Sequence, residues 1–338
     1  MIDPQAHIVV AGAGGVGCYV GGCLALAGRE VTLLSRPRTG KALRESGLHV
    51  SDLDGRDRTA EPGSIASSPD PAVLAKADIV LVTVKSRDTG EMGRLVAAHA
   101  RPDAVVVSLQ NGIDNAQRLK ALVAGRPVLA GMVPFNIVQP ARDTGPLHVH
   151  RASEGTVLLQ AGMPDLAGFL SVEGCAVATH PDIEGVLWGK LLFNLNNALV
   201  ALSDLPLATE LADRRWRLAL ARQIDEGLAA MKAAGIRPVS PAGGAPPALL
   251  PTILGLPDWL FGRLARRMLA IDPSARSSMW DDLQRRRPTE IDALQGAVLD
   301  LARRTGTATP AIERTIALVR AAEQAKAGPP RLGPDAFR

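Results

Sequence analysis

The chain has 338 residues, 46% of them hydrophobic and 21% charged, and a net charge of +4. This composition is typical of a globular protein with two domains, and it excludes a disordered chain. Because aromatic residues make up 3% of the chain and its three cysteines form no CxxC pair, we expect no nucleic-acid surface, no disulfide, no metal site and a cytoplasmic protein.

The first segment, residues 7–28, contains a long uncharged run that resembles a membrane span. Its many glycines, its strand-like opening IVVAG and the lack of a basic segment before it argue against this interpretation, so we expect no membrane association. The pattern instead predicts a buried strand over 7–11, a helix to about residue 27 and a second strand over 31–35.

A glycine-rich loop, GAGGVG, joins the first strand to the helix and matches the dinucleotide fingerprint GxGxxG. In this motif Gly12 allows a tight turn, Gly14 lets the backbone approach a pyrophosphate, and Gly17 lets the helix pack closely. The N–H groups at the start of the helix are suited to bind the phosphates. The predicted cofactor-binding residues of the loop are Gly12, Ala13, Gly14, Gly15, Val16 and Gly17.

The end of the second strand distinguishes between NAD and NADP. NAD-binding folds usually carry Asp or Glu there, which binds the ribose 2′-hydroxyl. This chain has Ser35 and Arg36 instead, with Arg38 close by, and a guanidinium suits the 2′-phosphate of NADPH. We therefore predict NADPH as the cofactor and Arg36 as a residue that binds it. The alternative is that Arg36 is a solvated loop residue.

Two further buried strands are predicted over 77–84 and 105–109, and polar residues follow both. Lys85 follows the first and Asn111 the second, at the strand ends where ligands bind in an open parallel sheet. The alternative for Asn111 is an ordinary Asn-Gly turn. We also expect a hairpin over 47–61, further strands of the sheet near 128–132, 146–150, 155–160 and 175–179, and structural roles for His148 and His150.

From residue 181 onward the apolar pattern becomes helical. The predicted helices cover 182–202, 208–234, 258–270, 278–287, 290–304 and 310–326, with an irregular, partly buried loop over 238–257. We therefore predict an α/β protein with an N-terminal, doubly wound Rossmann-type domain over 1–180, an all-α C-terminal domain over 181–328 and a frayed tail over 329–338.

The helix predicted over 182–202 carries polar side chains on its apolar stripe. A buried stripe that holds an ammonium group and two amides indicates a functional site or a satisfied polar network. The alternative for the lysine is a side chain whose charged end reaches solvent. At about 100° per residue, the stripe contains Ile183, Leu187, Lys190, Phe193, Asn194, Asn197 and Ala201.

Five short motifs complete the pattern that the glycine loop begins. They are VTVK at 82–85, QNG at 110–112, WGK at 188–190 with Asn194 after it, SSM at 277–279 and TEID at 289–292. In this order they resemble the ketopantoate reductase family. The resemblance implies a Rossmann domain followed by a helical domain, with the active site in the cleft between them. It also implies reduction of 2-dehydropantoate to pantoate with NADPH, in the pathway to pantothenate.

The resemblance assigns roles to individual residues. Lys190 is similar to the family's general acid, and Glu290 to an acidic residue near the nicotinamide ribose and the substrate. Asn111 matches a residue that contacts both ligands, Asn194 an amide that contacts the substrate, and Ser278 the hydroxyl that holds the substrate carboxylate.

The chain departs from the family at one position of the catalytic helix. The family's second asparagine lies eight residues after the lysine, where this chain has Ala198. Asn197 shares a helix face with Lys190, whereas Asn196 points about 120° away, so we predict Asn197 as the substitute.

Lysine is rare here, since seven of the 38 Lys and Arg residues are lysines. Hydride addition to a ketone leaves negative charge on oxygen, which needs a proton donor. A lysine whose pKa is lowered by burial can donate that proton and an arginine cannot, so Lys190 is interpreted as catalytic. Ser278 and Glu290 have structural alternatives, as a helix cap and as a first-turn carboxylate.

Two other functions stay open. The first is reduction of a different or bulkier 2-oxoacid on the same scaffold, because the asparagine is shifted and the segment 249–261 is apolar. The second is an NADPH-binding sensor without turnover, against which Lys190 and Glu290 argue. The expected partner is a small-molecule 2-oxoacid, and a homodimer is left open.

Overall fold

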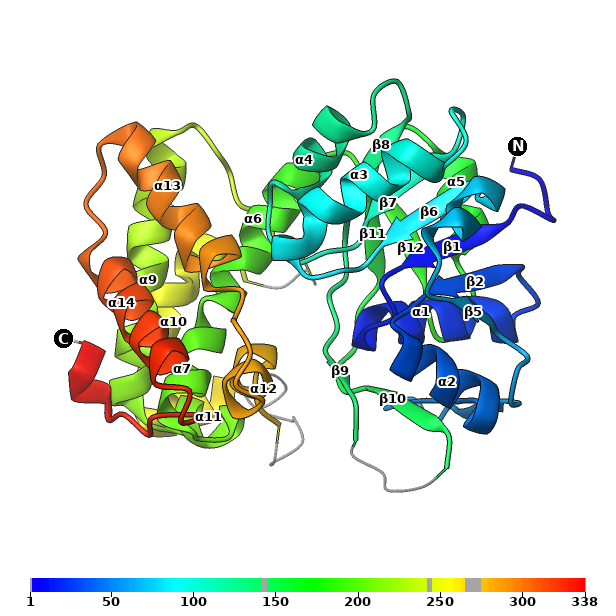
Figure 1. The fold of residues 1–338 in the computed structure, drawn as a ribbon. Coiled ribbons are helices and arrows are strands. Elements are labelled where there is room, and N and C mark those ends of the chain that lie inside the picture. Colours follow the sequence, from blue (N-terminus) through cyan, green and yellow to red (C-terminus); the bar gives the residue numbers. More distant parts are fainter. Residues whose placement is uncertain (1, 141–144, 242–244, 265–274, 338) are drawn as a thin grey trace. The chain divides into compact units, whose positions relative to one another are not determined.

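The computed structural model describes residues 2–140, 145–241, 245–264 and 275–337. The chain divides into two compact units, Met1–Ile183 and Glu184–Arg338 (Figure 1). The first unit is built from strands and helices and the second from helices, so the predicted fold class is confirmed.

The first unit is organised around one large sheet. Its strands are β1 (Ile8–Ala11), β2 (Val31–Leu34), β5 (Ala66–Ser68), β6 (Ile79–Val82), β7 (Val105–Ser108), β8 (Val128–Met132), β11 (Val157–Gln160) and β12 (Val177–His180). They lie in the order β12-β11-β8-β7-β6-β1-β2-β5. Neighbouring strands are parallel except β11 and β8, which are antiparallel.

The sheet is covered on both faces, which explains its uninterrupted apolar strands. Along β1, Ile8 and Val10 belong to one apolar core, whereas Val9 and Ala11 belong to a second core on the opposite face. The helices of this unit are α1 (Gly15–Leu26), α2 (Pro37–Ser46), α3 (Thr89–His99), α4 (Asn115–Leu122) and α5 (Pro164–Leu170), with 3₁₀ turns η1 (Pro71–Lys76) and η2 (Ser86–Asp88).

Helix α1 packs between two sheets. A Cβ on Gly21 would lie 2.6 Å from Leu33 of the large sheet, and a Cβ on Gly22 would lie 2.8 Å from Leu48 of a smaller one. Only glycine lets both sheets approach this closely. The apolar run over 8–28 therefore reflects a helix buried on both sides. Within the described ranges, no helix combines the length and apolarity needed to cross a membrane.

The smaller sheet corrects one prediction. It comprises β3 (Leu48–Asp52), β4 (Asp57–Ala60), β9 (Ile137–Val138) and β10 (Leu147–Arg151), in the order β4-β3-β10-β9. The hairpin over 47–61 is confirmed as β3–β4. The strand near 146–150 does not extend the large sheet, since β10 pairs with β3 and β9. Its alternating sequence LHVHR buries Val149 and turns both histidines to the other face.

Both of those histidines make structural contacts, as expected. His148 Nε2 and His150 Nδ1 lie 2.7 and 2.8 Å from Ser51 Oγ, and the His148 ring stacks on the ring of His49.

The second unit contains the helices that the apolar periodicity predicted, with small changes. They are α6 (Ile183–Asn194), α7 (Asn196–Ser203), α8 (Leu207–Ala212), α9 (Arg214–Ala233), α10 (Leu250–Leu254), α11 (Asp258–Leu264), α12 (Ser278–Gln284), α13 (Gln295–Thr305) and α14 (Pro310–Ala325), with 3₁₀ turns η3 (Pro247–Leu249), η4 (Ile291–Ala293) and η5 (Pro334–Phe337). The helix predicted over 208–234 is split because Asp213 caps α9, accepting a hydrogen bond from the Arg215 N–H. Residues 265–270 of the helix predicted over 258–270 lie outside the described residues.

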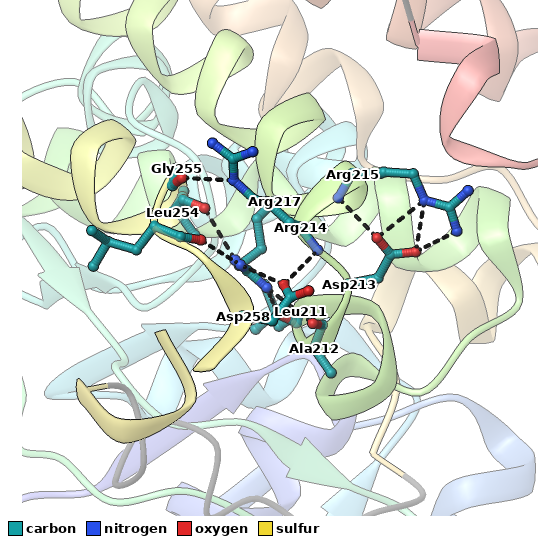
Figure 2. A network of polar contacts seen from close by, with 10 residues as sticks. Leu211, Ala212, Asp213, Arg214, Arg215, Arg217, Leu254, Gly255 and Asp258 are labelled. Carbon is teal, nitrogen blue, oxygen red and sulfur yellow. Dashed lines mark hydrogen bonds and ion pairs between the residues drawn. The ribbon is translucent and has the colours of Figure 1, made fainter. Parts of the chain in front are cut away.

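A buried arginine links α9 to the residues between α10 and α11. Arg217 of α9 has no exposed surface, and its guanidinium lies 4.1 Å from the ring centre of Phe261. Figure 2 shows Arg217 among the polar groups that it contacts. A guanidinium presents five donors and is satisfied only by several acceptors at once. Its acceptors are the carbonyl oxygens of Leu211, Ala212, Leu254 and Leu256 and the carboxylate of Asp258.

The C-terminal tail is packed, so the prediction of a frayed tail is wrong. Phe337 is buried, with its ring centre 5.4 Å from that of Trp216, and the Leu332 N–H donates to the Leu202 carbonyl oxygen at 2.8 Å. An aromatic residue next to the end of the chain can anchor the polar residues before it.

Candidate active site

The glycine loop between β1 and α1 is shaped by two close approaches. Gly12 has a φ of +119°, and a Cβ there would lie 2.8 Å from Val84 Cγ1. A Cβ on Gly17 would overlap the Gly12 carbonyl oxygen, which accepts a hydrogen bond from Thr83 Oγ1 at 2.6 Å. By contrast, no described atom lies within 4 Å of a Cβ placed on Gly14. The fold therefore requires Gly12 and Gly17, whereas Gly14 borders open space.

The same loop ends at an uncapped helix terminus. Gly14 is the N-cap residue of α1 and has no side chain to accept hydrogen bonds from the first turn. Ala13, Gly15 and Val16 are partly exposed beside it. A helix start with this geometry suits an anionic group such as a pyrophosphate.

A polar cluster lies at the ends of β2 and β5. Arg36 is exposed and is the N-cap residue of α2. Ser35 Oγ and Ser67 Oγ are buried and have no hydrogen-bond partner among the described residues. A Cβ on Gly40 would lie 3.0 Å from Ser35 Oγ, 3.4 Å from Ser67 Oγ and 3.2 Å from an Arg44 guanidinium nitrogen, so these groups converge. No sequence pattern pointed to Ser67, which reaches the cluster from the short strand β5.

The adjacent parallel strands β6 and β7 bring the Lys85 and Asn111 loops together. Ser86 Oγ and Asn115 Nδ2 each donate to the Asn111 carbonyl oxygen at 2.6 Å, and Asn115 Nδ2 also donates to Ser86 Oγ at 3.0 Å. Lys85 and Asn111 are half-buried beside these buried side chains. The turn at Asn111 is also present, since Gly112 has a φ of +95°. Sequence reasoning missed Ser86 and Asn115, which look like ordinary residues at helix starts.

In the second unit, α6 and α7 carry the proposed catalytic side chains on a half-buried face. Lys190, Asn194 and Asn197 share this face, on which Phe193 is 37% exposed. The predicted stripe is therefore only partly buried: Ile183 and Ala201 are buried, whereas Lys190, Asn194 and Asn197 are half-buried. The opposite face is fully buried and contains Leu191, Leu192, Leu195 and Leu199. A helix that is apolar nearly all round has no single stripe by which periodicity identifies the inner face.

The environment of Lys190 changes its acidity. Burial lowers the pKa of the Lys190 ammonium from 10.5 to about 8, and the negative charge of Glu290 opposes this shift. Glu290 is half-buried at the start of η4, where Thr289 Oγ1 accepts from the Ile291 N–H at 3.2 Å. Glu290 is the N-cap residue of this 3₁₀ turn, and α13 begins at Gln295 rather than at residue 290.

Two consecutive serines lie at the N-terminus of α12 and differ in their contacts. Ser277 is the N-cap, accepting from the Trp280 N–H at 3.1 Å and donating to the Asn197 carbonyl oxygen at 2.8 Å. Ser278 is the first residue of the helix and is exposed. The alternative in which Ser278 caps the helix is therefore wrong. Sequence reasoning also missed Ser277, which links the start of α12 to α7.

Two family models match the chain and together cover most of it. "Ketopantoate reductase PanE/ApbA" matches residues 8–163, and "Ketopantoate reductase PanE/ApbA C terminal" matches residues 182–323. A 2-dehydropantoate 2-reductase of Halobacterium salinarum is 31% identical over 327 residues, which cover 94% of this chain and 99% of the relative. A 2-dehydropantoate 2-reductase of Mesorhizobium japonicum is 27% identical, covering 93% of this chain and 96% of the relative.

Solved structures give the same result. The PanE/ApbA family ketopantoate reductase of Ralstonia eutropha aligns with a TM-score of 0.78 at 29% identity, covering 95% of this chain and 99% of that one. A D-mandelate dehydrogenase with bound NADH and anilino(oxo)acetate has a TM-score of 0.75 at 22% identity, with 95% and 99% coverage, and shares the fold. The sequence motifs, the two-unit architecture and these matches agree, and the chain belongs to the ketopantoate reductase family of oxidoreductases.

Proposed function

We propose that this protein reduces 2-dehydropantoate to pantoate with NADPH, and that Lys190 is the proton donor. One observation carries the proposal. The pKa of Lys190 is lowered to about 8, so its ammonium group releases a proton more readily than that of an ordinary lysine. Lys190 also shares a half-buried helix face with two amides. A general acid works best when its pKa lies near the working pH.

The first unit supports a dinucleotide cofactor. Gly14 borders open space at an uncapped helix start, which suits a pyrophosphate. Ser35 and Ser67 present unpartnered buried hydroxyls near Arg44, and exposed Arg36 follows Ser35 directly. Unpartnered buried polar groups are costly unless a ligand satisfies them, and this set fits a 2′-phosphate better than a bare ribose hydroxyl. When bound, the nicotinamide supplies a hydride.

The second unit supports the chemistry on the substrate. The Lys190 ammonium would donate its proton to the oxygen that becomes the C2 hydroxyl, and Glu290 favours the ammonium form that holds this proton. Asn194 and Asn197 would orient the substrate through their amides, and Ser278 would bind its carboxylate. In the first unit, Lys85 and Asn111 are proposed to contact the cofactor, and Asn111 also the substrate. Glu290 of the second unit is proposed to lie near the substrate and the nicotinamide ribose. A homodimer and a cytoplasmic location remain predictions.

The test is turnover of the reduced cofactor by the purified protein. We expect oxidation of NADPH when 2-dehydropantoate is added and much slower oxidation of NADH. Equal use of both cofactors would contradict the role of Arg36. A protein that binds NADPH but oxidises it with no 2-oxoacid would contradict the enzymatic proposal and favour the sensor.

A second candidate is reduction of a different 2-oxoacid on the same scaffold. The asparagine at the family's position is replaced by Ala198, which is fully buried, and Asn197 offers an amide one residue earlier. A shifted amide would change where the substrate side chain lies. Comparing kcat/KM across 2-oxoacids of increasing side-chain size separates the two candidates, because 2-dehydropantoate should give the largest value if the first proposal is right.

A further inference from the structure

The helix that carries Lys190 is interrupted at one residue. Helix α6 ends at Asn194 and α7 begins at Asn196, and we refer to Leu195 between them as the α6–α7 junction. Leu195 is buried, with φ of −57° and ψ of −27°. Lys190 lies before the junction and Asn197 after it. The backbone geometry of the junction therefore sets how these two side chains face one another.

Buried polar side chains gather on the inner side of this junction. Asn196 is 6% exposed, Gln223 is 1% exposed, and Glu210 and Gln295 have no exposed surface. Asn196 Nδ2 donates to Glu210 Oε2 at 2.8 Å. Gln295 Nε2 donates to the Leu195 carbonyl oxygen at 2.8 Å and lies 3.2 Å from Gln223 Oε1. The junction is therefore held by side chains from α8, α9 and α13.

This polar network is not the arrangement that stability alone would favour. Asn196 Oδ1, Glu210 Oε1, Gln223 Nε2 and Gln295 Oε1 each lack a partner among the described residues. Well-packed apolar side chains in the same space would avoid these unpaired atoms. Polar groups retained in a core at such a cost commonly fix one geometry out of several.

The Glu210 carboxyl is the one ionisable group among these four side chains. Burial raises the pKa of the Glu210 carboxyl from 4.5 to about 8, against the opposing effect of the Asn196 hydrogen bond. Burial thus favours the neutral, protonated form of Glu210. This form can hold Asn196 without placing a second negative charge beside the helix of Lys190.

We propose that Asn196, Glu210, Gln223 and Gln295 position the proton donor, by fixing the α6–α7 junction so that Lys190 and Asn197 keep one common face. This inference rests on the proposed role of Lys190. None of the four side chains is proposed to touch the substrate or the cofactor. They are positioning residues.

The first variants to compare are Glu210→Ala and Glu210→Gln. The alanine removes the acceptor for Asn196, whereas glutamine keeps a neutral side chain of the same shape. We expect Glu210→Ala to lower kcat by about tenfold to a hundredfold with little change in NADPH affinity, since small displacements of a catalytic group have effects of this size. Glu210→Gln should restore kcat to near the wild-type value. If Glu210→Ala does not fold, Gln295→Met removes the donor to Leu195 with little change in volume and should give the same kcat loss.

Val298→Ala is the matched control, because Val298 is a fully buried apolar side chain on α13, one turn from Gln295. It should lower the melting temperature while leaving kcat unchanged. Unchanged kcat in Glu210→Ala, failure of Glu210→Gln to restore it, or an equal kcat loss in Val298→Ala would each overturn the positioning role.

A second readout does not depend on activity. Amide hydrogen exchange over residues 186–203 should be faster in Glu210→Ala than in Val298→Ala. If the wild-type protein reduces no 2-oxoacid, the proposed function fails but this comparison still decides whether the network holds the junction. Equal exchange rates in the two variants would overturn the proposal that the network holds the α6–α7 junction.

Discussion

The glycine loop of the first unit and the Lys190 face of the second are built in opposite ways. The loop is made of backbone from consecutive residues, and its shape follows from close approaches that only glycine permits at Gly12 and Gly17. The Lys190 face combines side chains from α6 and α7 with the charge of Glu290, and an inner polar network holds its helix junction. A site made of local backbone can be identified from a motif, whereas a site made of distant side chains depends on how the helices pack.

The largest expected effect tests the Lys190 face. Lys190→Ala should lower kcat by about 10²- to 10⁴-fold, the usual contribution of a general acid, while NADPH affinity stays nearly unchanged. The measurement is steady-state turnover together with cofactor titration. Lys232→Ala is the control, since Lys232 is an exposed lysine of the same unit. A fully active Lys190→Ala protein would remove Lys190 from the mechanism.

The glycine loop is tested by two alanines with different expected outcomes. Gly17→Ala should prevent stable folding or shift the loop, because its Cβ would overlap the Gly12 carbonyl oxygen. Gly14→Ala should fold with a near-normal melting temperature, since its Cβ meets open space, but should weaken NADPH binding. Thermal melts and cofactor titration measure the two effects. Normal NADPH affinity in Gly14→Ala would argue against a pyrophosphate at this loop.

Cofactor choice gives a smaller effect. Arg36→Ala should weaken NADPH binding by about tenfold to a hundredfold, the range for a charge-assisted hydrogen bond, and leave NADH binding unchanged. Titrating both cofactors measures the ratio. Arg94→Ala, which changes an exposed arginine of α3, should alter neither affinity. An equal loss for NADH and NADPH would mean that Arg36 does not recognise the 2′-phosphate.

The pH profile tests the pairing of Lys190 with Glu290. Only the ammonium form of Lys190 donates a proton, so kcat/KM should fall as the pH rises through about 8. Glu290 raises the pKa of Lys190, so Glu290→Gln should move this fall to lower pH. The measurement is kcat/KM across the pH range for both proteins. A fall at unchanged or higher pH would contradict the pairing.

The smallest effect concerns stability. The pKa of Glu210 is raised from 4.5 to about 8, so the folded protein binds a proton that the unfolded chain has released between these values. Stability should therefore decrease as the pH rises from 4.5 to about 8 and change little above this range. Glu210→Gln should flatten this dependence and melt several degrees higher than wild type at pH 8. Parallel melting curves across this pH range would show that Glu210 is not protonated in the fold.

Several features were predictable because they depend on neighbouring residues. The βαβ order, the buried parallel strands and the change to helices near residue 181 follow from apolar periodicity and glycine placement. The hairpin over 47–61 is local as well. The placement of the strand at 147–151 in a second sheet was missed, because strand partners are chosen by long-range packing.

By itself, the sequence determined the glycine loop, the order of the elements and the residue types that can perform the chemistry. Each of these depends on backbone conformation or side-chain identity within a short stretch. The tertiary structure decided which face of α6 is buried, that Ser277 rather than Ser278 caps α12, and that Ser67 joins Ser35 beside Arg44. It also lowered the pKa of Lys190, because desolvation depends on side chains far apart in the sequence.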